Sequence, residues 1–516
     1  ALQKSRVIIA KNVEIAKGSF DQGRKIYYNA CYITTFQCIS INSMNKNIFA
    51  KKTKIVATIG PVTENEKTMT ALAKAGMDVI RLNFSHGDFV EHGKRVEVAR
   101  KVSAKLDKPI AILQDLAGPK IRIGEFYKER VQLKKGSTFT LTTKKMVGDE
   151  TKAFVNYKEL PKEVKKGDFI LLDDGKKKLQ VLSVHNDEIK CKVIVGGETK
   201  GRRGVNVPGV HLRISAITEK DKKDLEFGIK HQVDFIALSF VRQADDIVTL
   251  RKILRARGAD ISIIAKIETS EAIQNIDSII EQADGIMIAR GDLAIEVPTQ
   301  DVPILQKMII DKCNHAGKPV ITATQMLESM IKSPVPTRAE VSDVANSILD
   351  GTDAVMLSEE TTLGDYPVAA VTMMADVAVR VEGMRRKKKI SGVGDIAEVV
   401  DAVSGSVVYV ADKTGAKVIV ALTESGFTAR MISRFKPSQP IVVMSPYERA
   451  CRKMALSYGC YPVLIKPFKY VGQVTEHVGK FMIKNKLTHK GDKVVIAAGV
   501  PFGKVGGTNM LFVHEV

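Results

Sequence analysis

Short apolar segments alternate with longer amphipathic segments over most of the chain from residue 52 onward. Eight of the apolar segments have the length and character of buried β-strands: residues 54–60, 79–85, 111–116, 235–241, 261–268, 285–292, 319–325 and 354–360. Most of the intervening segments have helix length and are amphipathic, as in residues 64–75 and 245–257. Eight strands joined by helical crossovers favour a closed parallel (β/α)8 TIM barrel, with a doubly wound open sheet as the alternative.

The interval between residues 116 and 235 is too long for one crossover and has a different pattern. Short segments of alternating apolar and polar residues, separated by Gly-containing turns, are typical of antiparallel strands. They lie at residues 130–133, 138–142, 169–172, 178–183 and 188–195. We therefore expect an inserted small β-barrel domain at residues 118–212, which divides the TIM barrel domain into residues 51–117 and 213–384.

Two further regions differ from the barrel. After an Arg/Lys run at residues 385–389, strands at 418–422, 441–444 and 493–498 alternate with helical segments, which predicts a separate C-terminal α/β domain at residues 385–516. Residues 1–50 have no clear periodicity, and we expect a poorly ordered extension. The basic composition of residues 1–43 is compatible with an organellar transit peptide, but weak amphipathicity and Ser content favour an upstream stretch before a natural start at Met44.

The formal net charge of +21 is local. Residues 118–212 hold 21 Lys or Arg against 12 Asp or Glu, and most of the remaining excess lies in residues 1–50 and 385–389. A nucleic-acid-binding protein is one hypothesis, but the basic insertion has few aromatic side chains for stacking on bases. No apolar run reaches the ~18 residues of a membrane span. Six Cys without close spacing favour a reduced, cytoplasmic protein.

Polar side chains recur at the carboxyl ends of the predicted barrel strands, where barrel enzymes carry their active sites. They occur at six of the eight ends: Arg81, Asn83, Ser85 and His86; Gln114 and Asp115; Lys266 and Glu268; Arg290 and Asp292; Thr322 and Thr324; Ser358, Glu359 and Glu360. Solubility alone does not explain such repetition, so we expect these side chains to converge on one site.

Lys266 and Glu268 alternate along an apolar strand and therefore point to the same side. A structural ion pair would explain them about equally well, but Asp292 adds a second carboxylate at the next strand end. Two carboxylates suit Mg²⁺, with water and substrate oxygens completing its coordination. A Lys beside such a cation favours phosphoryl transfer or a developing enolate, and Arg81 with Arg122 offers guanidinium groups to phosphate.

In this order along the chain, the motifs resemble pyruvate kinase over nearly all of the sequence from about residue 52. The most specific stretch, residues 263–273, is similar to the family signature, and supporting stretches lie at residues 58–61, 81–87, 118–122, 204–209, 289–293, 322–330, 336–340 and 357–361. The resemblance implies a barrel, a β lid and a C-terminal regulatory domain. It also implies that phosphoenolpyruvate and ADP give pyruvate and ATP, the final step of glycolysis, with Mg²⁺ or Mn²⁺.

The resemblance further implies roles for individual residues. Lys266 would stabilise the phosphoryl group in flight, while Ser358 and Glu360 would relay a proton to the enolate carbon. Glu268 and Asp292 would hold Mg²⁺. The implied catalytic set is Lys266, Arg81, Thr324, Ser358 and Glu360. The implied substrate-binding set is Arg81, Arg122, Lys266, Ala289, Arg290, Gly291, Asp292 and Thr324. The implied nucleotide-binding set is Pro61, Asn83, His86, Arg122, Asp174 and Arg203.

One group of positions departs from the common family pattern. Asn83, Ser85 and Asp115 match a K⁺ site, but Leu116 replaces its Thr, and Lys120 stands where K⁺-dependent members carry Glu. This resembles the K⁺-independent branch of the family. A fixed ammonium could supply the positive charge otherwise supplied by the ion, so we expect activity without K⁺.

Other resemblances concern the lid and the C-terminal domain. Arg203 stands where a nucleotide-binding Lys is usual, which keeps the charge but changes the geometry. Thr423, Ser425, Gly426 and Thr428 resemble the family's effector phosphate loop, which suits a sugar phosphate or nucleotide, and an ordinary helix N-cap is the alternative. The family also suggests a homotetramer, without nucleic-acid or membrane partners.

Two alternative functions are less compatible with the sequence. A Mg²⁺-dependent lyase would have no ADP to cover, so Asp174 and Arg203 in the predicted lid argue against it. A catalytically inactive regulator would not need the residues of the predicted site, all of which are present: Lys266, Glu268, Asp292 and Thr324.

Overall fold

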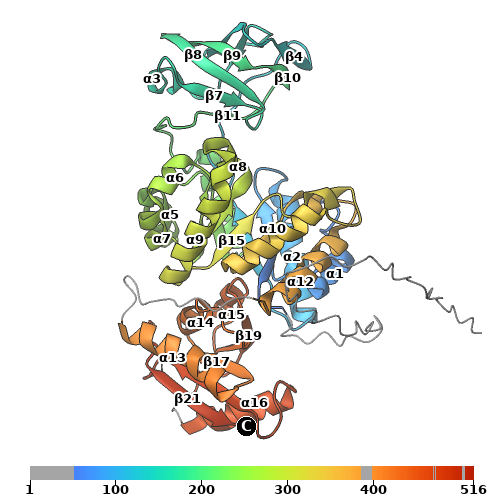
Figure 1. Ribbon diagram of the computed structural model, residues 1–516, viewed down its shortest axis with the longest axis vertical. Helices are drawn as coiled ribbons and strands as arrows, with labels where there is room; N and C mark the ends of the chain where they lie inside the picture. Colours follow the sequence, from blue (N-terminus) through green and yellow to red (C-terminus); the bar gives the residue numbers. More distant parts are fainter. Residues whose placement is uncertain (1–50, 385–397, 469, 471, 503–505) are drawn as a thin grey trace, which may run out of the picture. The chain divides into compact units, whose positions relative to one another are not determined.

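The computed structural model describes residues 51–384, 398–468, 470, 472–502 and 506–516 (Figure 1). The predictions made for the N-terminal extension and for the Arg/Lys run at residues 385–389 lie outside these described residues. Within them, no helix is long and apolar enough to cross a membrane.

Eight parallel strands close into a barrel, which confirms the closed sheet and excludes the open one. Around the barrel the strands are β1 (Lys54–Thr58), β2 (Val79–Asn83), β3 (Ala111–Asp115), β12 (Phe235–Leu238), β13 (Ser262–Ile267), β14 (Gly285–Ala289), β15 (Val320–Ala323) and β16 (Ala354–Leu357). The ring is closed where β1 pairs with β16, with Lys54 opposite Ala354. Nearly every strand residue is buried, because each strand is covered by helices outside and by side chains inside.

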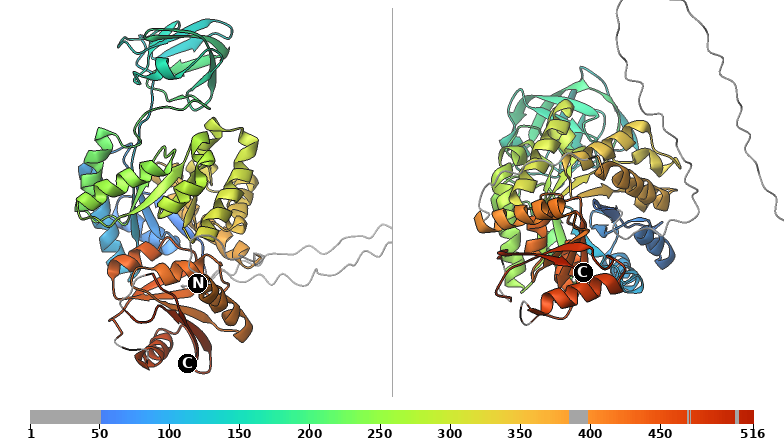
Figure 2. Two further views of the ribbon diagram at one scale, coloured as in Figure 1. Left: turned by 90° about the vertical axis from the view of Figure 1, so that its left-hand side faces the viewer. Right: turned by 60° about the horizontal axis from the view of Figure 1, so that its bottom comes forward.

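Helices surround the barrel strands on the outside (Figures 1 and 2). They include α1 (Glu66–Ala75), α2 (Phe89–Lys105), α4 (Glu219–Lys230), α5 (Ala244–Ala256), α6 (Ser270–Gln274), α7 (Ile276–Gln282), α9 (Val302–Ala316), α10 (Arg338–Asp350) and α12 (Pro367–Glu382). Their ends follow local rules. In α1, for example, the Asn65 side chain accepts a hydrogen bond from the Thr68 amide, and Gly76 ends the helix with φ at 132°.

All eight predicted barrel strands were too long at their carboxyl ends, and in two of them the excess residues belong to helices. Residues 290–292 open the short helix α8 (Arg290–Glu296), and residues 359–360 open α11 (Glu359–Thr362). The chain must turn there to leave the barrel, and buried side chains stabilise the turn. The Arg290 guanidinium, for instance, donates to Asp343 Oδ1 at 2.7 Å.

One aspartate precedes every second barrel strand, in a fourfold pattern. These residues are Asp78, Asp234, Asp284 and Asp353, directly before β2, β12, β14 and β16. Each carboxylate accepts a hydrogen bond from a backbone amide of the preceding barrel strand, at 2.8 to 3.2 Å: from Ile55, Ile112, Ile263 and Val320, respectively. Each aspartate also contacts a cationic side chain. The repeat fixes the register of the strands at the amino-terminal end of the barrel.

Two of those cations come from the C-terminal part of the chain. Lys436 Nζ lies 2.7 Å from Asp353, with both side chains at most 5% exposed. Arg452 Nε lies 2.8 Å from Asp234. The amino-terminal end of the barrel therefore carries ion pairs to the C-terminal domain, whereas the predicted active-site residues lie at the other end.

The inserted segment forms the predicted second sheet domain. Its strands are β4 (Arg130–Leu133), β5 (Thr138–Thr142), β6 (Lys152–Phe154), β7 (Phe169–Leu172), β8 (Lys177–His185), β9 (Glu188–Val195), β10 (Gly197–Lys200) and β11 (Val205–Asn206), with a short helix α3 (Leu160–Glu163). Six strands form one sheet in the order β11-β7-β8-β9-β5-β6, and β10 pairs with β4. Alternate residues face a small core that includes Phe139 and Leu179. We call this domain the lid.

The C-terminal domain is a separate α/β unit of the fold. Its five-stranded sheet has the order β19-β18-β17-β20-β21. The strands are β17 (Val418–Leu422), β18 (Ile441–Ser445), β19 (Cys460–Leu464), β20 (Lys493–Ala498) and β21 (Met510–Glu515), and the helices are α13 (Glu398–Thr414), α14 (Phe427–Ser433), α15 (Glu448–Met454) and α16 (Gly472–Lys484). β21 is antiparallel to β20. The sequence pattern predicted three of these strands and missed β19 and β21.

Candidate active site

Lys266 lies at the centre of the candidate site, near the carboxyl end of β13. Its ammonium is 2.9 Å from Glu268 Oε1 and 3.3 Å from Asp115 Oδ1, and it donates a hydrogen bond of 2.7 Å to Ser239 Oγ. Burial alone would lower the pKa of Lys266, but the charges of Asp115 and Glu268 outweigh burial and raise that pKa. Lys266 is therefore a fixed positive charge in a largely buried site.

Glu268 and Asp292 are the candidate metal ligands. Glu268 is buried directly after β13, and its Oε2 accepts a hydrogen bond of 2.8 Å from the Phe240 amide. Burial raises the pKa of Glu268; Lys266 opposes this rise and the charge of Asp292 adds to it. A divalent cation would relieve the repulsion between the two carboxylates.

The donor set fits Mg²⁺ in one specific way. Among the described residues, no group of three or more His, Cys, Asp or Glu forms a metal cluster. Mg²⁺ commonly uses only one or two protein carboxylates and takes its remaining ligands from water and substrate phosphate. Glu268 and Asp292 match that arrangement, and they do not match a metal site made of protein ligands alone.

Arg81 and Asp115 connect two neighbouring strands beside Lys266. Arg81 Nε lies 2.7 Å from Asp115 Oδ2, and an Arg81 terminal nitrogen donates to Thr58 Oγ1 at 3.0 Å. Burial opposes ionisation of Asp115, but Lys266 and Arg81 together lower its pKa. One buried carboxylate thus holds two cationic side chains at the carboxyl ends of the strands, where they can face an anionic substrate.

Thr324 and Gly291 form a polar corner at the start of α8, next to Asp292 in the sequence. The Thr324 hydroxyl accepts a hydrogen bond of 2.8 Å from the Gly291 amide and donates one of 2.6 Å to the Ala323 carbonyl. Thr324 has φ at 70°, an uncommon value for a β-branched residue that often marks a functional position. The Arg290 guanidinium instead contacts Asp343 and the Thr324 carbonyl, so only the Arg290 backbone is available for a ligand.

Ser358 and Glu360 lie together at the end of β16. Glu360 is buried, and its carboxylate accepts hydrogen bonds from the amides of Ser358 at 2.7 Å and Leu327 at 3.2 Å. Burial raises the pKa of Glu360, although the backbone donors oppose the rise. Thr322 does not join them, because its hydroxyl donates to Thr352 at 3.0 Å inside the barrel.

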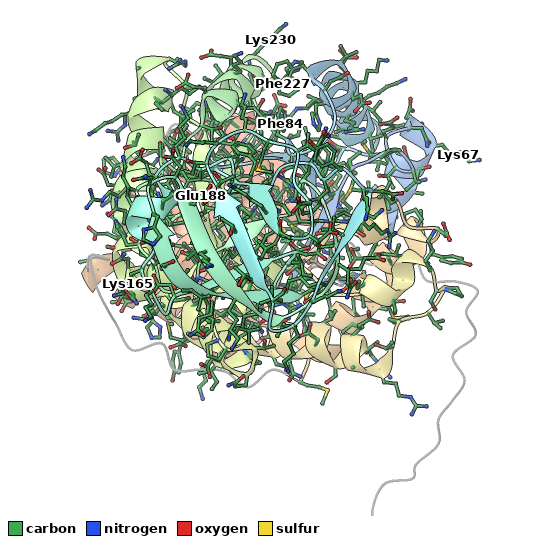
Figure 3. All side chains as sticks on the ribbon, turned by 90° about the horizontal axis from the view of Figure 1, so that it is seen from above. Lys67, Phe84, Lys165, Glu188, Phe227 and Lys230 are labelled. Carbon is green, nitrogen blue, oxygen red and sulfur yellow. The ribbon has the colours of Figure 1, made fainter. Side chains whose placement is uncertain are left out.

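The barrel's candidate nucleotide residues are exposed or half-buried at the ends of β1 and β2: Pro61, Asn83 and His86. A buried His92 on α2 supports their loop, because its Nε2 lies 2.9 Å from the His86 carbonyl oxygen. Phe84 packs beneath the loop with its ring centroid 5.2 Å from that of Phe227, and Figure 3 labels both rings. The loop is therefore fixed to the barrel while its polar side chains stay accessible.

Lid and barrel residues line one common pocket. It includes Lys120, Asp174, Gly204, Phe240, Arg242, Asp292 and Glu296. Arg203 Nε lies 3.3 Å from Asp173, next to Asp174, and an Arg122 terminal nitrogen donates to the Arg202 carbonyl at 3.0 Å. The lid therefore presents its predicted charged residues on loops beside the pocket.

Lys120, the predicted replacement for the cation, lies on the segment that follows β3. It is exposed, and a Cβ atom placed on Gly204 would lie 3.5 Å from Lys120 Cε. In the described part of the chain no ion pair involves Lys120, whereas Asp115 is already engaged by Arg81 and Lys266. Leu116 is buried and offers no ligand oxygen from its side chain.

Sequence reasoning missed Ser239 and the Phe240 amide. Ser239 is buried after β12, accepts a hydrogen bond from Lys266 and donates one of 2.7 Å to the Leu116 carbonyl. It directly follows β12, the fourth barrel strand, whose end carries few ionisable residues. The polar Ser at the end of an otherwise apolar strand was the available signal.

The candidate effector loop lies in the C-terminal domain. Thr423 Oγ1 accepts a hydrogen bond of 3.0 Å from the Gly426 amide, and Gly426 has φ at 87°. Thr423, Glu424, Ser425 and Thr428 line a pocket together with Gly506 and Gly507. The stretch at residues 503–509 is the candidate for a facing loop, and its residues 503–505 lie outside the described residues.

Comparison with known proteins gives consistent matches over almost the whole chain. The family model described as "Pyruvate kinase, barrel domain" matches residues 50–371, and "Pyruvate kinase, alpha/beta domain" matches residues 401–514. A protein named pyruvate kinase from Clostridium acetobutylicum is 45% identical over 471 residues, covering 90% of this chain and all of the relative.

Other relatives agree. A pyruvate kinase from Staphylococcus saprophyticus is 46% identical over 472 residues, which cover 90% of this chain and 80% of that protein. A crystal structure of a pyruvate kinase from Cryptosporidium parvum superposes with a TM-score of 0.86 at 38% identity. It covers 90% of this chain and 96% of that one.

Proposed function

The chain belongs to the pyruvate kinase family and is a phosphotransferase, and we propose that it transfers the phosphoryl group of phosphoenolpyruvate to ADP with Mg²⁺ and without K⁺. The single observation that carries the proposal is the Lys266 ammonium, held between Asp115 and Glu268 at the carboxyl ends of the barrel strands. Phosphoryl transfer needs positioning and charge neutralisation more than covalent chemistry, and this arrangement supplies both.

The phosphoryl group is neutralised by cationic side chains in fixed positions. Lys266 and Arg81 are both anchored on Asp115, so their positive charges need no rearrangement as the phosphoryl group leaves the enolate oxygen. Arg122 joins them from the lid. Mg²⁺, held by Glu268 and Asp292, would add further positive charge to the phosphoryl and enolate oxygens.

The enolpyruvate carboxylate is assigned to the corner formed by residues 289–292 and Thr324. The amides of this turn lie at the start of α8. The Thr324 hydroxyl accepts from the Gly291 amide and donates to the Ala323 carbonyl, and it would exchange the second bond for one to the substrate carboxylate. Ser358 and Glu360, at the neighbouring strand end, are assigned to the delivery of a proton to the enolate carbon. The raised pKa of Glu360 suits a carboxyl group that keeps its proton at higher pH than usual.

ADP is assigned to the ends of β1 and β2, which carry Pro61, Asn83 and His86, with Asp174 and Arg203 approaching from the lid. A basic lid that closes over two anions lowers their repulsion and excludes water, which would otherwise accept the phosphoryl group.

K⁺ independence is supported by Leu116 and Lys120. Leu116 removes one ligand oxygen, and Lys120 lies on the segment that leads into the lid. The proposal requires the Lys120 ammonium to reach Asn83 and Ser85 when the lid closes. Regulation by a phosphorylated effector at Thr423, Ser425, Gly426 and Thr428 and assembly as a homotetramer remain further predictions.

Steady-state kinetics with the purified chain test the proposal. Phosphoenolpyruvate, ADP and Mg²⁺ in a buffer whose only monovalent cation is tetramethylammonium should give equimolar pyruvate and ATP, and added KCl should not raise kcat. Removal of Mg²⁺ by a chelator should stop turnover. Absence of ATP formation in the presence of Mg²⁺ would refute the assigned reaction, whereas strong activation by KCl would refute only the K⁺ independence.

A further inference from the structure

The lid is joined to the barrel by two segments, and one buried carboxylate contacts both. The outgoing linker follows β3, at residues 116–120, and the return linker, residues 215–218, leads into α4. Asp221, in the first turn of α4, is fully buried. Its Oδ1 accepts a hydrogen bond of 3.2 Å from the Gly118 amide of the outgoing linker.

The other oxygen of Asp221 holds the return linker. Oδ2 accepts hydrogen bonds from the Thr218 amide at 2.8 Å and from the Thr218 hydroxyl at 2.6 Å. In the other half of this capping box, Thr218 Oγ1 accepts from the Asp221 amide at 3.1 Å. A capping box alone needs only the Thr218 contacts, so the bond to Gly118 is an additional function of the same side chain.

Gly118 is also fixed by its own conformation and packing. Its φ is 65°, a left-handed value that glycine adopts without strain. A Cβ atom at this position would lie 3.0 Å from Ser239 Cβ and 3.0 Å from the Phe240 ring. The outgoing linker therefore passes directly against the residue that accepts a hydrogen bond from Lys266.

A second bond connects the same linker to the catalytic centre. The Leu116 carbonyl accepts the hydrogen bond of Ser239, which in turn accepts one from Lys266. The outgoing linker is thus held at two points, by Ser239 at Leu116 and by Asp221 at Gly118. The return linker is held at Thr218 by the same Asp221.

We propose that Asp221 is a positioning residue, a clamp that ties both lid linkers to the barrel and so sets where the lid closes over the site. The negative charge of Asp221 is stabilised by three neutral donors and by the amino-terminal end of a twelve-residue helix. This inference rests on the lid-dependent phosphoryl transfer proposed above.

Asp221→Asn separates the clamp from the helix cap. The Asn side chain has one acceptor, its oxygen, where Asp has two. We expect this oxygen to take the place of Asp221 Oδ2, which accepts from the two Thr218 donors. The Asn amide group then faces the Gly118 N–H, donor against donor, and the outgoing linker is released. Thr218→Val is the matched control, because it removes both hydrogen bonds of the Thr218 hydroxyl and leaves the bonds of Asp221 to the Thr218 and Gly118 amides intact.

Hydrogen–deuterium exchange of the full chain gives a readout that does not need activity. We expect Asp221→Asn to raise deuterium uptake at residues 116–121, and Thr218→Val to raise it only in the first turn of α4. Kinetically, Asp221→Asn should raise the KM for ADP about tenfold, corresponding to loss of one hydrogen bond to a charged group, with a smaller effect of Thr218→Val.

Identical exchange and kinetic changes in both variants would overturn the clamp, because Asp221 would then be only a helix cap. The clamp would also be overturned if deuterium uptake at residues 116–121 of Asp221→Asn stayed at the wild-type level. If Asp221→Asn does not fold, Gly118→Ala, which displaces the same amide and keeps the cap, must give the linker pattern. If the chain showed no activity toward phosphoenolpyruvate, the function would be wrong, while the exchange result would still decide whether Asp221 joins the linkers.

Discussion

The Asp115 carboxylate holds Lys266 in place: its Oδ1 lies 3.3 Å from the Lys266 ammonium, while its Oδ2 lies 2.7 Å from Arg81 Nε. All three side chains are largely buried. The site therefore presents two cations to the substrate, and one carboxylate of the protein neutralises part of their charge before substrate binds.

Asp115→Asn should lower kcat more than it changes the KM for phosphoenolpyruvate. The amide keeps the shape but not the charge, so Lys266 and Arg81 lose their anchor while the site becomes more positive toward an anionic substrate. We expect kcat to fall about tenfold or more, the size of one lost charged hydrogen bond. Steady-state kinetics against the exposed control Asp107→Asn measures this. A large rise in KM with unchanged kcat would contradict it.

The double change Leu116→Thr with Lys120→Glu should make activity depend on K⁺. It restores a ligand oxygen at position 116 and a negative charge at position 120. A monovalent cation should then be needed to supply the positive charge that we assign to Lys120 in the closed lid. We expect kcat without K⁺ to fall and to recover on titration with KCl. Activity that stays insensitive to KCl in the variant would argue against a role of Lys120 as a replacement cation.

Most of the fold was predictable because buried barrel strands have long apolar runs. All eight barrel strands were found, and the errors lie at their ends, where Arg290 and Glu359 begin helices. The strands that were missed are short or at an edge, such as β6 and β21, and their residues alternate weakly. The aspartates before every second strand were visible in the sequence, but their common role depends on strand neighbours that only the closed barrel defines.

Asp353→Asn should destabilise the chain strongly. It leaves the Lys436 ammonium buried without its carboxylate, at a cost of about 3 kcal/mol in the free energy of unfolding. The double variant with Lys436→Met should recover much of that loss, since both charges are then gone. Denaturant unfolding measures the effect. The exposed pair Lys332 and Asp365 is the matched control, and the same changes there should cost about 0.5 kcal/mol.

If Asp353→Asn were as mild as the change in the exposed pair, the ion pair between barrel and C-terminal domain would contribute little. Asp353 also accepts hydrogen bonds from the Val320 and Tyr458 amides. If the double variant were no more stable than Asp353→Asn, the loss of stability would come from weakening these two hydrogen bonds and not from the unpaired ammonium.

Lys54 should make stability depend on pH. Its side chain is buried, and desolvation lowers the pKa of Lys54 to about 8 from an ordinary value of 10.5. The unfolded chain then binds more protons than the folded chain between these values, so stability rises with pH across this window. Lys54→Met removes the effect. The unfolding free energy of Lys54→Met minus that of wild type should be about 2 kcal/mol larger at pH 6.5 than at pH 9.5.

Thermal or denaturant unfolding at several pH values measures this difference, with the exposed Lys74→Met as the control. The difference in unfolding free energy between wild type and Lys54→Met could instead stay constant with pH. Lys54 would then keep its ordinary pKa, because the Cys460 carbonyl at 2.6 Å and the Tyr461 ring would stabilise its charged form.

The candidate site was predictable as far as it consists of ionisable residues at strand ends. Lys266, Glu268, Asp115 and Arg81 converge as expected, because the carboxyl ends of parallel strands meet at one end of a barrel. Ser239 and Asp221 could not be assigned in the same way. A single Ser or a first-turn Asp is common in any sequence, and only the closed barrel shows that one contacts Lys266 and the other contacts both lid linkers.

The measurement that tests the account most directly is the turnover number of Lys266→Met with phosphoenolpyruvate, ADP and Mg²⁺, beside wild type and the exposed control Lys252→Met. Loss of the charge that stabilises the phosphoryl group should lower kcat ~100-fold or more, with a folded protein by circular dichroism and a normal kcat in the control. A Lys266→Met enzyme that retained kcat within about threefold of wild type would contradict the central role of Lys266.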